Sequence, residues 1–437
     1  MANEKALALL ELLKIELQGD PAVAPAYLAP SDRTPRGKPP LPPLGPAGFT
    51  VADPTFGSTI RRVTDGLTVA TGASWHVPSN AHLAAWNADS SCFYVIGNAG
   101  KRIYRRDGSF VGTFTSQPEA QFSRVDPDGL FVGAGPVGRT LQRYSLSKKT
   151  YTTVLEIDAL ELPTVTPRTY LGGICSSAAP EVLVAFFGGE QADLHRFVVW
   201  MPLDGRPRKV IDTQGTIIAG GSVVTGFWLH SVSVDLSGRY VVLYPTSSLS
   251  PAVAKKIVWD TVTDTFTLLP EVSARMDGHD ALGFGTMINM EGASASQPYD
   301  AAQWVIRDLA TPLVMTDVVN PVLTPKVTTL DDHTSWNSAQ RDRRVPVLSA
   351  TFHTSPSTTW RAWDDELIAI DPVAGGTIWR FMHHRSVIDP NQFWTQPIPN
   401  VSPDGRFAIV HTTWENTLGP DPDGGFRRDV FLVALAR

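Results

Sequence analysis

Short apolar runs recur along most of the chain and are separated by tight polar turns. Typical runs are residues 93–97, 182–187, 240–244 and 407–411. Turns such as Asp126-Pro127-Asp128-Gly129 stand between them. Brief runs bounded by Gly, Pro and Asp are typical of β-strands, because an amphipathic helix needs a longer run with a period of about 3.6 residues. The pattern therefore predicts an all-β fold.

Several of these runs belong to repeats with a shared spacing. In three repeats a polar side chain stands four residues before the apolar residue that opens a turn: His82 before Trp86, Gln121 before Val125, and His230 before Val234. Corresponding segments begin near residues 82, 121, 171, 230, 279, 333 and 396. Units of roughly 40–60 residues have the period of propeller blades. We therefore predict a seven-bladed β-propeller with a short N-terminal helix and a Pro-rich linker.

The two ends of the chain differ from the repeats. Residues 1–18 are predicted to contain a helix with a leucine stripe, which either packs on its own domain or docks a partner or oligomerises. Residues 19–47 are rich in proline and should form a linker or a strap over the fold. Residues 48–437 should form the propeller. We expect residues 60–63 and 67–70 to pair with the strands of residues 407–435 and so close the ring.

Composition and charge narrow the function classes. The 437-residue chain is 43% hydrophobic, enough for a large core, and its formal charge of −6 argues against a nucleic-acid partner. No apolar run approaches the ~18–20 residues that span a bilayer. No signal peptide is visible, which leaves the cytoplasm open, as well as export or association with a virion by another route.

The opening positions of the repeats carry the candidate chemistry. Innermost strands of a propeller run along its axis, so the residues that open them ring one mouth of the channel. These residues are His82, Gln121, His230, His279, His333 and Gln396. Imidazole can hold a metal, transfer a proton or bind a sugar hydroxyl. The alternative is that each side chain only bonds a neighbouring blade.

Three segments are denser in functional groups than the rest. One runs from Asp331 through Asp332, His333, Trp336 and Asn337 to Arg341, a second contains His279 and Asp280, and a third contains His384, Arg385, Trp394 and Gln396. Asp and His together suit a divalent cation, and Arg suits a carboxylate. Turn formation alone could also explain the Asp-rich and Asn-rich stretches.

Residues 332–337, 379–386 and 396–405 resemble, in this order, the final blades of TolB-like propellers, which include the oligogalacturonate lyases and related bacterial propeller proteins. The resemblance implies a central cation that is held by histidines and a glutamine and neutralises a uronate carboxylate, while a basic residue removes the C5 proton. Gln396 would match that glutamine and His333 a histidine of the preceding blade. Where the family has further histidines, this chain has Pro397-Ile398-Pro399, so His279, His230 or an aspartate would have to substitute.

These observations lead to a functional hypothesis: a carbohydrate-active propeller, a polysaccharide or oligosaccharide lyase acting on an acidic or complex polysaccharide at the channel mouth. The catalytic candidates are His333, His230 and Arg385. The candidate ligands of a divalent cation, Mn²⁺ or Ca²⁺, are His279, Asp280, Asp332, Gln396 and His384. The substrate-binding candidates are Arg341, Trp336, Asn337, Trp394, His82 and Gln121. A glycoside hydrolase remains open, with Asp280 and Asp332 as carboxylates about 5–10 Å apart. So does a non-enzymatic glycan-binding or protein-binding propeller anchored by its N-terminal helix.

Overall fold

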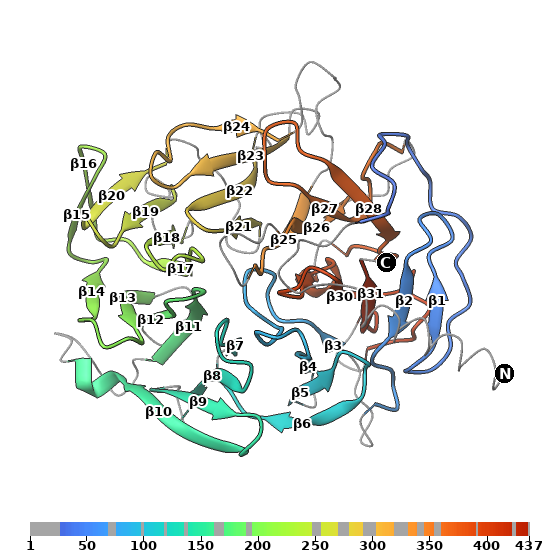
Figure 1. Cartoon of the computed structure of the whole chain (residues 1–437), viewed down its shortest axis with the longest axis horizontal. Coiled ribbons are helices and arrows are strands. Elements are labelled where there is room, and N and C mark those ends of the chain that lie inside the picture. Colours follow the sequence, from blue (N-terminus) through green and yellow to red (C-terminus); the bar gives the residue numbers. More distant parts are fainter. Residues whose placement is uncertain are drawn as a thin grey trace.

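The chain folds into an all-β propeller, seen down its axis in Figure 1. The computed structural model describes residues 27–68, 76–97, 100–117, 120–134, 139–160, 170–188, 195–246, 255–269, 279–291, 303–318, 331–338, 345–353, 360–389, 392–421 and 425–435. Within these residues no α-helix occurs, and no helix has the length and apolarity to cross a bilayer. The predicted helix of residues 1–18 lies outside the described residues.

Two blades form the first part of the ring, and each is a four-stranded antiparallel meander. The first contains β3 (His76–Val77), β4 (Cys92–Gly97), β5 (Gly100–Arg105) and β6 (Phe110–Phe114). The second contains β7 (Gln121–Phe122), β8 (Gly129–Ala134), β9 (Thr140–Ser145) and β10 (Thr150–Glu156), followed by the 3-10 helix η1 (Ile157–Leu160).

A ten-stranded mixed sheet follows. Its first meander contains β11 (Tyr170–Ser176), β12 (Val182–Gly188), β13 (His195–Pro202) and β14 (Lys209–Asp212), and its second contains β17 (Leu229–Val234), β18 (Tyr240–Pro245), β19 (Ile257–Asp260) and β20 (Thr265–Leu268). A hairpin of β15 (Thr216–Ala219) and β16 (Ser222–Thr225) lies between them in the chain and joins β20 through the parallel pair Ala219 and Phe266. The pair His195 and Leu229 links the two meanders.

Three further blades complete the ring. One contains β21 (Asp280–Leu282), β22 (Thr286–Glu291), β23 (Gln303–Asp308) and β24 (Thr316–Asp317), and the next contains β25 (Asp331–Ser335), β26 (Val347–Phe352), β27 (Glu366–Ile370) and β28 (Ile378–His383). The 3-10 helix η5 (Phe393–Thr395) leads into the last blade. That blade contains β29 (Pro399–Val401), β30 (Phe407–Thr412) and β31 (Asp429–Ala434), with β2 (Thr59–Arg62) and β1 (Thr50–Ala52) added at its outer side.

The ring is closed by strands from opposite ends of the chain. In Figure 1 the blue strand β2 lies beside the red strand β31, and its register pairs Ile60 with Val433 and Arg62 with Phe431. Arg62 Nη2 also lies 2.5 Å from an oxygen of the fully buried Asp429. The predicted pairing of residues 60–63 with the C-terminal strands is confirmed.

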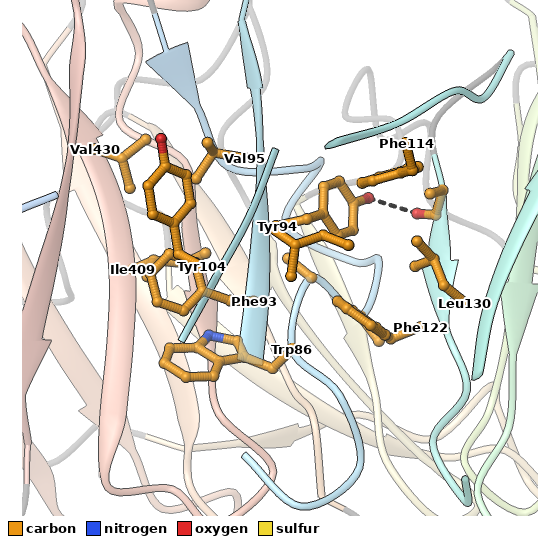
Figure 2. Close-up of a cluster of buried hydrophobic side chains, with 14 of the residues drawn as sticks. Trp86, Phe93, Tyr94, Val95, Tyr104, Phe114, Phe122, Leu130, Ile409 and Val430 are labelled. Atoms are coloured by element: carbon orange, nitrogen blue, oxygen red, sulfur yellow. Dashed lines mark hydrogen bonds between the residues drawn. The ribbon is translucent and has the colours of Figure 1, made fainter. Parts of the chain in front are cut away.

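Aromatic side chains pack between neighbouring blades. Figure 2 shows one such cluster, in which Trp86 and Phe93 of the first blade lie near Ile409 of the last blade, while Tyr94 lies near Phe122 of the second. The Tyr94 hydroxyl donates a hydrogen bond to the Ala120 carbonyl, so this buried polar group keeps a partner. Burying a large apolar side chain stabilises a fold by roughly 1.5–3 kcal/mol, so each such cluster holds adjacent blades together.

The described part of the proline-rich stretch, residues 27–47, runs along β28. The backbone N–H of Arg380 donates to the Pro30 carbonyl, and its guanidinium donates to the Thr34 carbonyl. Farther along, His383 Nε2 donates to the Arg36 carbonyl. Proline has no N–H to offer, but the carbonyls of the segment remain available as acceptors. The segment thereby covers the outer edge of this blade, which would otherwise be open to pairing with another chain.

Three histidines are enclosed in the last two blades as neutral rings. Burial lowers the pKa of His383 to about 4, and that of His384 and His411 to about 3. His384 Nε2 donates to the Thr351 carbonyl and its Nδ1 accepts from the Ser386 N–H, which defines its tautomer. His411 Nε2 donates to the Trp394 carbonyl. These rings would have to take up protons on unfolding below pH 6.5.

Replacing Asp429 with Asn should lower the free energy of unfolding by about 3–5 kcal/mol, because it leaves the nearly buried Arg62 guanidinium without its counterion. The measurement is the urea midpoint followed by tryptophan fluorescence. Asp204→Asn is the matched control, since its ion pair with Arg206 is 41% and 48% exposed and should contribute less than about 1 kcal/mol. Equal effects of the two substitutions would contradict the closure role of Asp429.

Lowering the pH should destabilise the wild type more than the variant His411→Gln. A His pKa that folding lowers contributes stability that is fully present above pH 6.5 and is lost as the pH falls towards the folded pKa. At about 1.4 kcal/mol per pH unit, the variant should gain roughly 2 kcal/mol on the wild type between pH 7 and pH 5. Urea midpoints at both pH values test this difference, and a gap that does not change with pH would contradict it.

Candidate functional site

The innermost strands, among them β7, β11, β17, β21 and β25, surround the middle of the ring (Figure 1). Residues of β11, β17 and β21 line a channel there. Its upper part is a cavity of about 210 Å³. The lining residues are Asn80, His82, Leu83, Gly172, Gly173, Ile174, Phe186, His230, Ser231 and Val232. His82 and His230, both predicted at the channel mouth, therefore share one cavity.

A narrower hollow of about 10 Å³ follows the same strands one step farther along the axis. Residues 172–174 of β11 and 230–232 of β17 line the upper cavity, whereas residues 175–176 and 233–234 line the lower hollow. Because a strand rises about 3.3 Å per residue, the two spaces are stacked along the channel. His82 borders both of them.

Glycines shape one wall of the upper cavity. A Cβ on Gly173 would stand 2.5 Å from the Phe186 ring, and a Cβ on Gly172 would stand 2.5 Å from the His195 ring. A bulge in β11 between Leu171 and Gly173 lies at the same place. Glycine at both positions therefore lets the rings of Phe186 and His195 pack directly against the backbone of β11.

A group of one imidazole and two carboxylates stands where β21 and β25 begin. One ligand atom each from His279, Asp331 and Asp332 lies within 4.8 Å of the others. His279 Nδ1 is 3.3 Å from Asp331 Oδ1 and also contacts the Asp332 carbonyl. The fully buried Asp332 accepts bonds from Trp304 Nε1 and Ser349 Oγ, both at 3.0 Å. These bonds orient the carboxylate beside the imidazole.

His333 stands directly behind this group. Its ring stacks on His279 at 4.7 Å and on Phe352 at 5.4 Å. Nδ1 lies 3.2 Å from the Pro397 carbonyl, while Nε2 is buried without a hydrogen-bond partner. Burial, reinforced by His279, lowers the pKa of His333 to about 3. A neutral ring whose Nδ1–H is engaged presents the lone pair of Nε2, which can ligate a cation or accept a proton.

The donor set suits a divalent cation. Carboxylate oxygens are ligands for Mg²⁺, Ca²⁺ and Mn²⁺, and imidazole suits transition metals, whereas Ca²⁺ and Mg²⁺ sites use oxygen almost alone. A mixed set of two carboxylates and a histidine fits Mn²⁺ better than Ca²⁺. His279, Asp331 and Asp332 would be the ligands, and the His333 ring is stacked on that of His279. Gln396, also predicted as a ligand, is half-buried at the C-terminal end of η5.

Several predicted residues have other partners. Asp280 lies 2.5 Å from Lys256 in a buried ion pair, because neighbouring residues on a strand face opposite ways and His279 takes the other side. His384 has both ring nitrogens bonded to the backbone, away from the group of His279. Arg385, predicted as a catalytic residue, donates to Glu415 and to the Pro39 carbonyl.

The remaining predicted residues mostly tie blades together. Gln121 accepts from the Ala84 N–H and donates to Ser176 Oγ. Trp336 Nε1 donates to the Val345 carbonyl, and its ring packs over Gly283 while bordering the lower hollow. Trp394 is half-buried beside Phe393, with ring centroids 5.2 Å apart. Arg341 lies outside the described residues.

Two residues of the channel were not among the predicted site residues. Asp331 lies in the acidic segment noted in the sequence, where it could equally have been a turn residue. Its closeness to His279 in the structure identifies it as a candidate ligand. Arg124 reaches across the channel, donating from Nε to the Ser176 carbonyl and from Nη1 to Asn337 Oδ1. The sequence contains a signal for Arg124. In each repeat one residue directly precedes the apolar residue that opens the turn. That residue is uncharged in three repeats, where it is Ala85, Ser233 or Asn400, and it is the charged Arg124 in the second blade.

Solved structures with similar folds include two oligogalacturonate lyases. One, in complex with manganese, is 12% identical with a TM-score of 0.58, covering 89% of this chain and 96% of that chain. The other, from Vibrio parahaemolyticus, is 10% identical with a TM-score of 0.53, covering 88% of this chain and 96% of that chain. TolB from Acinetobacter baumannii is 12% identical with a TM-score of 0.35, covering 70% of this chain and 65% of that chain. No family model and no curated sequence matches the chain. At these identities, the likeness to the two lyases shows a shared propeller fold.

Asp331→Asn should weaken Mn²⁺ binding on the order of tenfold or more, because it removes a charged oxygen ligand from the group. Asp331 is the better position to change, since Asp332 also holds Trp304 and Ser349. Isothermal titration calorimetry with MnCl₂ and CaCl₂ is the measurement, with Asp204→Asn as the control. Unchanged Mn²⁺ affinity in Asp331→Asn would show that this group is not the cation site.

Proposed function

We propose that the six sheets represent seven blades, with the ten-stranded sheet counted as two. Its two meanders, β11–β14 and β17–β20, each have the four strands of an ordinary blade. Between the described strands of the two meanders, the pair His195 and Leu229 is the link, and the hairpin β15–β16 is attached to β20 at the far side of the second meander. We also propose residues 1–18 as a docking or oligomerisation helix, residues 19–47 as a strap, and residues 48–437 as the propeller.

We further propose that the protein is a carbohydrate-active lyase that cleaves an acidic polysaccharide or oligosaccharide at the channel mouth by β-elimination. The observation that carries this proposal is the cluster of His279, Asp331 and Asp332 with the unpartnered Nε2 of His333 behind it. This cluster lies at the start of the innermost strands of a fold shared with oligogalacturonate lyases. The substrate class is proposed from that fold likeness together with the cation-binding donor set.

The chemistry requires a base, a charge neutraliser and a proton donor for the leaving oxygen. A bound Mn²⁺ would neutralise the uronate carboxylate and make the adjacent C–H more acidic. His230, half-buried in the wall of the upper cavity, would take the C5 proton. The electrons of that C–H bond form the C4–C5 double bond while the C4–O bond breaks. His82, across the same cavity, is a candidate to return a proton to the leaving oxygen.

The hydrolase alternative has less support. Hydrolysis needs one carboxylic acid and one carboxylate facing the same glycosidic bond. Asp280 is committed to Lys256, and Asp332 accepts bonds from Trp304 and Ser349. Neither carboxyl group is therefore placed as a free acid or base in the upper cavity.

Incubation with oligogalacturonides and Mn²⁺ should yield products with the ultraviolet absorbance of an unsaturated uronate. His230→Gln should lower the rate by about 10²–10⁴-fold through loss of the base. Chelation with EDTA should abolish turnover, and added Mn²⁺ should restore it.

Asp204→Asn, on the outside of the ring, is the control and should leave the rate unchanged. Saturated reducing ends without ultraviolet absorbance would favour the hydrolase. Binding of the oligosaccharide without any turnover would favour a non-enzymatic propeller, and either result would overturn the lyase proposal.

A further inference from the structure

The 3-10 helix η5 presents an exposed aromatic ring beside the group of His279, Asp331 and Asp332. Phe393, the first residue of η5, is 46% exposed. Its ring stands at 86° to the ring of His333, with centroids 5.7 Å apart. The His333 ring in turn stacks on His279 at 4.7 Å. A single imidazole therefore separates Phe393 from the candidate ligands of the cation.

Its position, more than its exposure, distinguishes Phe393. Single exposed apolar side chains are common on protein surfaces. Two of them, Phe110 of β6 and Tyr151 of β10, are 48% and 42% exposed on outer strands. Each packs on a tyrosine of its own blade, Tyr104 at 5.8 Å and Tyr144 at 4.8 Å. Blade packing thus accounts for those two rings, whereas the Phe393 ring contacts the candidate site.

The backbone that carries Phe393 is anchored by buried groups. The hydroxyl of the buried Thr395 donates to the Gln392 carbonyl at 2.8 Å. The Trp394 carbonyl accepts from His411 Nε2 at 2.9 Å, and the Trp394 ring lies 5.2 Å from the Phe393 ring at 80°. Because these contacts hold η5 in place, little conformational entropy is lost when a ligand packs on the exposed ring.

An exposed aromatic ring beside a polar group suits a sugar chain. The face of an aromatic ring carries partial negative charge, and the hydrogens on the carbons of a pyranose carry partial positive charge. A pyranose can therefore lay its C–H face on Phe393, while a neighbouring sugar of the same chain meets the imidazole and carboxylate groups. Stacking of this kind does not depend on whether the sugar carries a carboxylate.

We propose that Phe393 is a stacking platform for the sugar ring that adjoins the reacting one, at the mouth of the channel. The platform recognises the C–H face of a pyranose, acidic or neutral. This inference rests on the proposed function and adds a second sugar subsite to it, so the substrate is a chain of at least two sugars. Phe393 acts as a positioning residue, because it holds the chain and takes no part in proton transfer.

The test is calorimetric titration of the full chain with trigalacturonate and with neutral (1→4)-β-galactotriose. All proteins carry His230→Gln, which removes the proposed base and leaves the acidic trisaccharide uncleaved. Phe393→Ala should then weaken binding of both trisaccharides roughly three- to tenfold, as expected for the loss of one aromatic contact. Phe110→Ala is the matched control, because its ring is exposed to a similar extent on the outside of the ring of blades and its loss should not change affinity.

Further variants separate stacking from support of His333. Phe393→Tyr keeps an aromatic ring and should bind like Phe393, whereas Phe393→Leu keeps only apolar bulk and should bind as weakly as Phe393→Ala. Mn²⁺ affinity should be the same in all three, since no cation ligand is changed. In the lyase assay with His230 intact, Phe393→Ala should raise KM and leave kcat unchanged, because the contact is present both before and during the reaction.

Unchanged affinity in Phe393→Ala, or full affinity in Phe393→Leu, would overturn the inference. A loss confined to trigalacturonate would overturn it too, because stacking does not require a carboxylate. An accompanying loss of Mn²⁺ affinity would show that Phe393 only supports His333. Binding of neither trisaccharide would equally contradict the platform.

The lyase assay separates this inference from the proposed function. Trisaccharide binding that depends on Phe393, without any unsaturated product, would overturn only the lyase proposal. Unsaturated product formed with an unchanged KM in Phe393→Ala would overturn only the stacking platform.

Discussion

The rest of the structure depends on the pairing of β2 with β31. A propeller sheet becomes a ring only when strands from both ends of the chain share a blade, and here residues near 60 and 432 do so. The buried Arg62–Asp429 contact adds an ionic bond at the same joint. With the joint closed, every innermost strand is held at a fixed distance from the axis. The positions that open those strands then meet around one channel, although they lie far apart in the sequence.

The proline-rich segment of residues 27–47 covers the edge of β28, which would otherwise be open to pairing with another chain. Its carbonyls accept from Arg380, His383 and Arg385, side chains that would otherwise have to find partners elsewhere. The bidentate pair of Arg380 with the buried Glu366 anchors the same edge. His383 and Arg385 bond to this segment, and His384 bonds to the Thr351 carbonyl and the Ser386 N–H, so this dense polar segment of the sequence contributes to blade architecture.

Some polar residues of the channel hold neighbouring blades together, whereas others are available for binding a ligand. Gln121 and Asn337 tie blades together through hydrogen bonds of both the oxygen and the nitrogen of their amides. His279, Asp331, Asp332 and His333, by contrast, concentrate imidazole and carboxylate groups within a few ångströms, with one ring nitrogen left without a partner. Arg124 belongs to the bracing residues, because its guanidinium donates to the Ser176 carbonyl and to Asn337 Oδ1.

The sequence by itself determined the strands, the turns and the repeat. Alternation of apolar runs with Asp-Gly and Pro-containing turns is local chemistry, and runs such as residues 93–97, 182–187 and 407–411 lie within observed strands. The shared spacing also predicted that polar residues open the innermost strands. Tertiary structure decided which of them meet. Asp280 faces Lys256, Asp331 joins His279, and Arg124 reaches Asn337 only because blade packing and strand direction place them so. A side chain's partner depends on the distance across the ring, and a local pattern of residues contains no measure of that distance.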